Sequence, residues 1–354
     1  MTVLCLVFLL EMSAFDPWKT GIFRWLCLGV MMLYYLDSVL KTDGNTHVPS
    51  CFALLLIPMS VQCLQDPVSA PTALVRNVSF LIFIFVLANL LERESRAETE
   101  ACMFRFAKLF IWTVLTGSLI FFQRYSGNHD WIGMTANRNM TVSVLMSAAG
   151  LSRAFTSRKY RIAEASAVLL AWRTGSRMAA VMTALLYGRR ILNHLCISVP
   201  LLAGFFMEKE KIVPLRRLFA SSQSLKRDTW KIGLDLFAEN PLLGCGSGSA
   251  WYYTFAENAG GWGRGMHNSW LVILSETGIL GALFYFAFFA VSAGHIRSGM
   301  YGTDPRLFQA CTAVLVMLGV NGLSESFLFS AGNVMSLPFW MSFLFLEKMG
   351  RSQA

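Results

Sequence analysis

Long apolar runs, separated by short polar stretches, dominate the pattern of positions along the chain. A helix of about 20 mainly apolar residues is long enough to cross the hydrocarbon core of a bilayer. The runs here reach about 14 to 27 residues, so the pattern predicts an all-α polytopic membrane protein with about twelve transmembrane helices. We expect these helices near residues 2–14, 21–40, 49–65, 74–91, 104–122, 138–152, 162–172, 178–188, 191–206, 268–293, 307–324 and 334–347.

The composition agrees with a membrane protein. Of the 354 residues, 55% are hydrophobic and 14% are charged, whereas about a quarter of the residues of a soluble domain are charged. The net charge of +9 is typical of cytoplasmic loops that face anionic lipid headgroups. We therefore expect the lipid bilayer as a partner and no nucleic acid. The segment 2–14 lacks the basic start and the cleavage site of a signal peptide, so we expect a retained short helix there.

The distribution of Lys and Arg between the loops predicts the orientation, because cytoplasmic loops carry the excess of positive charge. If the N-terminus is cytoplasmic, the cytoplasmic loops contain Arg93, Arg96, Arg153, Arg158, Lys159, Arg161, Arg189, Arg190, Arg297, Arg306, Lys348 and Arg351. The opposite loops contain Lys19, Arg124, Arg138, Arg173 and Arg177. We therefore expect one integral membrane domain over residues 1–354, with both termini in the cytoplasm and the large loop 207–266 outside it.

Two predicted helices, 162–172 and 178–188, are too short to span a bilayer comfortably, and Gly175 and Ser176 interrupt the sequence between them. Non-helical backbone at membrane depth survives only where protein or a watery cavity satisfies its polar groups. The pair indicates either a cavity open to the outer face that contains Arg177, or an ordinary outer turn whose arginine extends to the headgroups.

Most of the candidate chemistry collects in residues 226–281, which begin inside the large loop. Trp230, Leu234 and Phe237 recur at the spacing of one helical face, so we expect a short amphipathic helix that can lie at the membrane interface and ends at Asn240-Pro241. The following run of Gly244, Gly246 and Gly248 does not match a dinucleotide fingerprint. It favours a bend that brings the backbone close to another helix, or a nest of amides that binds an anion.

His267 is the strongest single candidate, because it lies where this polar stretch meets a long apolar helix that we expect to run without a break. A neutral imidazole accepts a proton near pH 7 and is the commonest general base. The alternative is a structural histidine that caps the start of the helix or hydrogen-bonds a neighbour. Arg177 and Arg227 matter in combination with it, because guanidinium groups match phosphate oxygens and stay charged in a low-dielectric site. Other cations that could take the same role are Arg216, Arg217, Lys226 and Arg264.

Glu276 lies nine residues after His267 and deeper along the same predicted helix, so we expect no direct contact between them. A carboxylate inside the membrane marks either a functional site or a structural hydrogen bond between helices. Gly278 and Gly281 beside it permit close helix packing. Asn321 and Glu325 are placed on one face near the outer end of another helix, with the same two interpretations.

The strings KRDTWKIGLDLFAENPLLGCGSG and MHNSWLVILSETGILGALFYF resemble the signature region of the O-antigen ligase and polymerase family. TGSRMAA at 174–180 is similar to an earlier Ser-Arg element of that family. Weaker similarities are TANRN at 135–139 and GLSESFLF at 322–329. The resemblance covers roughly residues 130–330 in order.

The resemblance implies a GT-C-like, inverting, metal-independent glycosyltransferase of the bacterial inner membrane with a large periplasmic loop and no cofactor. Its donor would be a glycan linked to undecaprenyl diphosphate. His267 would assist the acceptor hydroxyl, Arg177 and Arg227 would hold the diphosphate, and Asn268, Glu276 and Glu325 would support them. Ligation onto lipid A-core is slightly favoured by the His-Asn motif. Polymerisation of repeat units onto a growing glycan is the alternative, and a transporter of lipid-linked glycans is the competing class.

Overall fold

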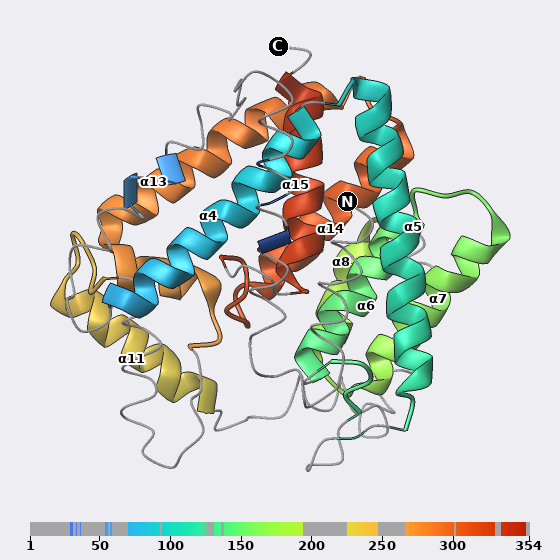
Figure 1. Cartoon of the computed structure of the whole chain (residues 1–354). Coiled ribbons are helices and arrows are strands. Elements are labelled where there is room, and N and C mark those ends of the chain that lie inside the picture. Colours follow the sequence, from blue (N-terminus) through green and yellow to red (C-terminus); the bar gives the residue numbers. More distant parts are fainter. Residues whose placement is uncertain are drawn as a thin grey trace. The chain divides into compact units, whose positions relative to one another are not determined.

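The computed structural model describes most of the helical part of the chain (Figure 1). The described residues are 29, 30, 33, 36, 54, 55, 57, 58, 70–92, 94–123, 125, 131–135, 138–193, 225–246, 266–300, 302–329 and 334–351. Every regular element within them is a helix. The elements are α4 (Ala70–Glu92), α5 (Arg96–Ile120), α6 (Arg138–Ser152), α7 (Arg158–Arg173), α8 (Arg177–Asn193), α11 (Leu225–Glu239), α13 (Ser269–Gly299), α14 (Pro305–Asn321) and α15 (Ser336–Arg351).

The predicted helices that fall on described residues are present, with ends that differ from the prediction by up to eight residues, as at the start of α5. Helices α5 and α13 are long and apolar enough to cross a membrane, and α14 and residues 79–89 of α4 form shorter apolar helices. The described part is therefore all-helical and suited to a membrane, whereas the total of about twelve spans and the GT-C-like arrangement stay predictions. The predicted helices outside the described residues, wholly or in large part, are 2–14, 21–40, 49–65 and 191–206.

The chain forms two compact units that are interleaved along the sequence. Unit 1 comprises residues 1–23, 102–222 and 304–321, and unit 2 comprises residues 24–101, 223–303 and 322–354. The single membrane domain over residues 1–354 stays a prediction. Of the large loop 207–266, the structure describes residues 225–246 and Met266.

Small residues hold unit 1 together. Helix α6 is buried from Thr141 to Ser152 and packs against α7 and α14. At Gly150, an added Cβ atom would lie 2.9 Å from Met317 Cε of α14, so the glycine sets the close approach of these two helices. Near the other end of the contact, Asn321 Nδ2 donates a hydrogen bond to Ser143 Oγ at 2.6 Å. A buried polar pair therefore fixes the register of two mainly apolar helices.

Helices α7 and α8 form the interrupted pair that the sequence predicts. Gly175 has a φ of 64°, in the left-handed region that glycine adopts without strain. Ser176 precedes α8 and accepts the amide of Met178 at 3.3 Å, as a residue at a helix start commonly does. Both helices are longer than expected, at 16 and 17 residues.

An aromatic cluster forms the core of unit 2, where α13 lies beside α15 and α4 contacts α15 (Figure 1). Trp340 of α15 has its ring centroid 5.4 Å from Phe80 of α4 and 5.4 Å from Phe343. Phe288 and Phe289 of α13 also contact Phe343, with ring centroids 5.4 and 5.6 Å apart. Most of these pairs meet edge to face, which is the favourable geometry for aromatic rings.

Charged side chains also connect these three helices. The contacts lie near the C-terminal ends of α4, α13 and α15. Glu347 of α15 is buried, and its Oε1 lies 3.0 Å from His295 Nδ1 of α13. Arg351 Nε donates to the same oxygen at 2.7 Å, and Arg351 also pairs with Glu92 of α4. Lys348 donates to the backbone carbonyls of Leu91, in the last turn of α4, and of Glu94, just after that helix. The buried carboxylate is thus paired and hydrogen-bonded, as burial of charge requires.

Helix α13 is broken, which corrects the prediction of a helix that runs without interruption after His267. Gly278 has a φ of 61° and a ψ of −168°, which separates a short first segment from a long second one. The loop 240–246 fills the break and exchanges backbone hydrogen bonds with both segments. These bonds run from Cys245 N to Ser275 O at 2.9 Å, Gly246 N to Glu276 O at 3.1 Å, Ile279 N to Pro241 O at 2.8 Å and Leu280 N to Leu242 O at 3.2 Å.

Two glycines allow this insertion. Gly244, with a φ of 73°, lies against the backbone of residues 276–278, and Gly278 lies against the backbone of residues 242–244. A Cβ atom on either glycine would overlap main-chain atoms of the other segment. Because an interrupted helix exposes amides and carbonyls that a bilayer does not satisfy, the loop supplies the missing partners.

We predict that Gly278→Ala destabilises the protein, because alanine at a left-handed φ costs about 1–3 kcal/mol before any steric overlap is counted. Gly294→Ala is the matched control in the same helix, since an added Cβ there meets no atom within 4 Å. The control should be neutral or slightly stabilising, as alanine favours helix over glycine. Thermal unfolding in detergent measures both. Equal melting temperatures for the two variants would contradict the described break.

Candidate active site

His267 lies in the short link between the large loop and α13. The cap of α13 is the next residue, Asn268, whose Oδ1 accepts the amides of Trp270 and Leu271 at 3.0 Å each. Such side-chain acceptors satisfy amides that the first turn of a helix leaves without partners. The cap of α13 is therefore Asn268 and not His267, whereas the alternative of a structural histidine that hydrogen-bonds a neighbour is not tested.

The backbone of His267 is strained. Its φ of 52° makes it the one non-glycine residue with a positive φ in the described part of the chain. Residues other than glycine rarely adopt this region, and such strain persists where the surrounding structure enforces it, often at functional sites. Here the preceding residue, Met266, is buried against Leu236 and Leu271, and the following residue caps α13.

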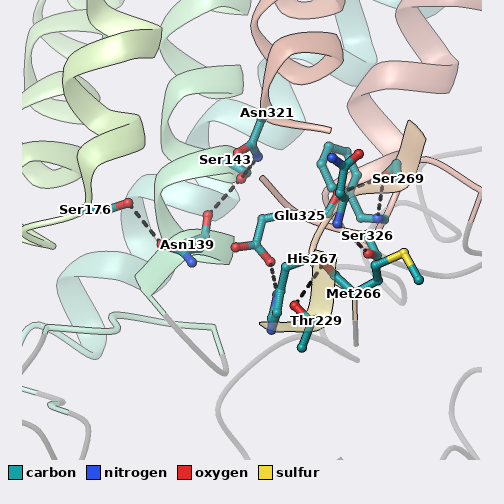
Figure 2. Close-up of polar contacts among 12 residues, drawn as sticks. Asn139, Ser143, Ser176, Thr229, Met266, His267, Ser269, Asn321, Glu325 and Ser326 are labelled. Carbon is teal, nitrogen blue, oxygen red and sulfur yellow. Dashed lines mark hydrogen bonds and ion pairs between the residues drawn. The ribbon is translucent and has the colours of Figure 1, made fainter. Parts of the chain in front are cut away.

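The imidazole of His267 pairs with Glu325 (Figure 2). Nδ1 lies 3.1 Å from Glu325 Oε2, and the side chains of His267 and Glu325 are 36% and 8% exposed. With Glu325 ionised and the imidazole neutral, Nδ1 carries the hydrogen and Nε2 presents its lone pair, because a carboxylate accepts and does not donate. A partly exposed imidazole in this tautomer, held by a nearly buried carboxylate, is suited to accept a proton.

Glu325 does not share a helical face with Asn321, which corrects the prediction for this pair. Helix α14 ends at Asn321, and Glu325 lies in the irregular segment 322–329. After the end of the helix, a tertiary hydrogen bond replaces helical bonding: the carbonyl oxygen of Gly322 accepts the amide of Ser269 at 2.7 Å. Asn321 belongs to unit 1 and bonds to Ser143, whereas Glu325 belongs to unit 2 and pairs with His267.

Helix α11 is the predicted amphipathic helix, and it packs against α13. Leu236 contacts Met266 and Leu271, whereas Trp230 and Leu234 of the predicted apolar face are exposed. Gly233 allows the contact, since an added Cβ would collide with Met266 Sδ. The location of this helix at a membrane interface stays a prediction.

The first turn of α11 brings the backbone of Arg227 toward the site. Thr229 Oγ1 donates to Met266 O at 3.5 Å, so residue 229 lies beside the residue that precedes His267. Arg227 is two residues earlier, about 3 Å along the helix axis. The structure describes its backbone in α11, while its side chain lies outside the described part.

Arg177 is described in unit 1, separately from the pair of His267 and Glu325. It is the first residue of α8 and is half-buried. The preceding Ser176 donates its hydroxyl hydrogen to Asn139 Oδ1 of α6 at 3.0 Å (Figure 2). Arg138 opens α6 in the same way that Arg177 opens α8. The starts of these two helices, each with an arginine, are therefore joined by a hydrogen bond.

Glu276 and the glycine-rich run belong to the break in α13 rather than to the histidine. The side chain of Glu276 is buried, and its backbone carbonyl accepts the amide of Gly246. The amides of Gly244 and Cys245 donate to the carbonyls of Asn240 and Ser275 at 2.8 and 2.9 Å. With these amides engaged, the described part of the run is a bend against a helix and not an anion nest. Gly248 lies outside the described residues.

The fold and this site are those of a helical membrane protein. A histidine paired with a carboxylate lies at the start of a helix that is long and apolar enough to cross a membrane. A model of the family described as O-antigen ligase matches residues 75–286, more than half of the 354 residues. The chain therefore belongs to the O-antigen ligase family, as the resemblance predicts, and this supports a role in glycan processing at a membrane. A search among curated proteins found no match.

We predict that His267→Gly is more stable than His267→Ala by about 1 kcal/mol, because glycine adopts a positive φ without the cost that alanine meets. Both variants lose the bond to Glu325 equally, so the comparison isolates the backbone. Thermal unfolding of the purified variants in detergent measures the difference. An alanine variant as stable as the glycine variant would contradict a left-handed backbone at this position.

Proposed function

We propose that the protein is a glycosyltransferase that moves a glycan from undecaprenyl diphosphate onto an acceptor sugar hydroxyl at the periplasmic face of the inner membrane. Family membership supports the class of activity. The acceptor that the proposal favours is lipid A-core, which would make the protein a ligase. Polymerisation onto a growing lipid-linked glycan requires the same donor chemistry and differs in the acceptor.

The observation that carries the proposal is the contact between His267 Nδ1 and Glu325 Oε2 at 3.1 Å. It fixes the tautomer in which Nε2 accepts, and it stabilises the positive charge that forms when the imidazole takes a proton. Glu325 lies beyond the residues that the family model matches, so its role in the proposal derives from geometry. Strained backbone at His267 agrees with a residue held for function.

In the proposed step, the acceptor oxygen forms a bond to the anomeric carbon of the donor sugar. The bond between that carbon and the phosphate oxygen breaks, and undecaprenyl diphosphate leaves with the electron pair. The proton of the acceptor hydroxyl passes to Nε2 of His267. Attack from the face opposite the leaving group inverts the configuration at the anomeric carbon. No metal or cofactor is part of the proposed step.

Two arginines are assigned to the negative charge that develops on the leaving diphosphate. Arg227 is favoured because the first turn of α11 lies beside Met266 and thus beside His267. Arg177 is assigned because its motif TGSRMAA resembles the family's Ser-Arg element. Asn268 supports the site by capping α13 next to His267. Glu276 supports it indirectly, through the break that shapes the same helix.

We predict that the purified protein transfers glycan from a defined undecaprenyl-diphosphate donor when it is offered lipid A-core and a second lipid-linked repeat unit together. A single product on lipid A-core identifies a ligase, and a ladder of lengthened lipid-linked chains identifies a polymerase. Gel mobility and mass spectrometry of the products distinguish the two. Absence of any product would contradict the proposed transfer and favour a transporter. A transporter gives no product in detergent solution, because there is no membrane across which to move the glycan.

In the same assay, His267→Gln should lower the rate about a hundredfold to ten-thousandfold, because it removes the general base. Arg177→Ala and Arg227→Ala should each lower it about a hundredfold to a thousandfold. His295→Gln is the matched control, since His295 also pairs with a buried glutamate in unit 2 but lies at the other end of α13. Full activity of the folded His267→Gln variant would rule out the assignment of the base.

A further inference from the structure

Glu325, which orients His267 in the proposed function, is not held by a helix of its own. It lies in the irregular segment 322–329, between the end of α14 and α15. The position of its carboxylate therefore depends on hydrogen bonds that the main chain of this segment makes with other elements. Those bonds lead to one side chain at the start of α13.

That side chain is Ser269, the first residue of α13, which is 3% exposed. Its Oγ donates to the backbone carbonyl of Glu325 at 2.7 Å. The same oxygen accepts the amide of Phe327 at 3.0 Å and the amide of Leu328 at 3.3 Å. One hydroxyl thus bonds to the main chain of the glutamate and to two amides that follow it, and it defines the turn that carries Glu325.

Two further hydrogen bonds align this segment with the residues around His267. The amide of Ser269 donates to Gly322 O at 2.7 Å, and the amide of Asn268 donates to Ser326 Oγ at 2.9 Å. Asn268 and Ser269 are the first and second residues after His267. Their amides bond to residues that lie on both sides of Glu325 in the sequence. Figure 2 shows Ser269, Ser326, Glu325 and His267 within one group of contacts.

We propose that Ser269 is a positioning residue, which holds the main chain of Glu325 so that its carboxylate meets Nδ1 of His267. The inference rests on the proposed function and deepens it, because it names the residue that keeps the base oriented. Loss of the hydroxyl leaves a buried carbonyl and two buried amides without this partner, so the segment shifts to satisfy them. A shift of about 1 Å is enough to disturb a catalytic hydrogen bond.

The experiment compares Ser269→Val with Ser269→Thr, which have nearly the same shape and differ in the hydroxyl. Thr277→Val is the matched control, because Thr277 is a buried hydroxyl in the same helix whose bonds, to Ile273 O and Gly278 O, stay local. Each variant is measured for kcat and for the KM of the donor in the transfer assay. The Ser269→Val change is also made together with Glu325→Gln to complete a double-mutant cycle.

We predict that Ser269→Val lowers kcat about tenfold to a hundredfold with little change in the KM of the donor, as loss of a supporting partner typically does. Ser269→Thr should restore most of the rate, and Thr277→Val should match the wild type. In the Glu325→Gln background, Ser269→Val should cause no further loss, because the residue acts through Glu325. If Ser269→Val is not recovered folded, Ser269→Ala takes its place in the same cycle.

Independent, multiplicative losses in the double variant would overturn the positioning role, and so would equal rates for the threonine and valine variants. Wild-type rates for Ser269→Val, with His267→Gln and Glu325→Gln both impaired, would overturn this inference and leave the proposed function standing. Wild-type rates for His267→Gln and Glu325→Gln would instead overturn the roles of both residues in the proposed function. The two failures therefore give different results.

Discussion

The need to satisfy backbone amides and carbonyls determines the architecture of unit 2. Helix α13 is interrupted at Gly278, and an interruption exposes polar groups that lipid does not satisfy. The loop 240–246 satisfies these groups with four hydrogen bonds across the break. The close approach is possible because Gly244 and Gly278, which face each other, have no side chains. The exchange fixes the end of α11 to the middle of α13. Helix α11 and the start of α13 therefore form one piece, and the site is built on that piece.

The same constraint explains why a strained residue persists at the start of α13. Met266 is buried against α11, and Asn268 is committed to capping α13 and to Ser326. His267, between them, has little freedom to relax from its φ of 52°. Contacts on both sides of the histidine thus hold the strained backbone in place. For this reason the imidazole can be exchanged experimentally while the turn that carries it remains.

The sequence predicts most of the fold that local pattern controls. Apolar runs locate the helices, the Gly-Ser pair at 175–176 locates the turn between α7 and α8, and the His-Asn step locates the start of α13. The break at Gly278 is not predictable in this way, because both segments of α13 are apolar and the loop that fills the break lies more than thirty residues earlier. A signal did exist in the two glycine motifs, Gly244-x-Gly246 and the glycine after Glu276-Thr277, but their pairing is a tertiary fact.

The residues of the candidate site also fall into those that local sequence indicates and those that only tertiary contacts reveal. His267 was found from its position between polar and apolar sequence, which is a local feature, whereas its partner Glu325 lies 58 residues away. Sequence spacing placed Glu325 on a helix with Asn321, because it assumes that helical bonding continues where apolar pattern does. Here the bond from Ser269 N to Gly322 O replaces helical bonding after Asn321. The role of Ser269 was missed for the same reason, since a serine after an N-cap asparagine carries no signal of the segment it holds.

The hydrogen bonds around His267 distinguish the two nitrogens of its ring. Nδ1 faces Glu325, the amides on either side of the turn are engaged in capping or in bonds to the segment 322–328, and the described residues make no bond to Nε2. In the proposed function, Nε2 is the nitrogen that takes the proton of the acceptor hydroxyl. The imidazole is about one-third exposed while Glu325 is nearly buried, so the proposal needs no displacement of the carboxylate when the acceptor hydroxyl approaches the ring. Proton acceptance and orientation therefore act on opposite sides of one ring, as a general base held by a fixed partner requires.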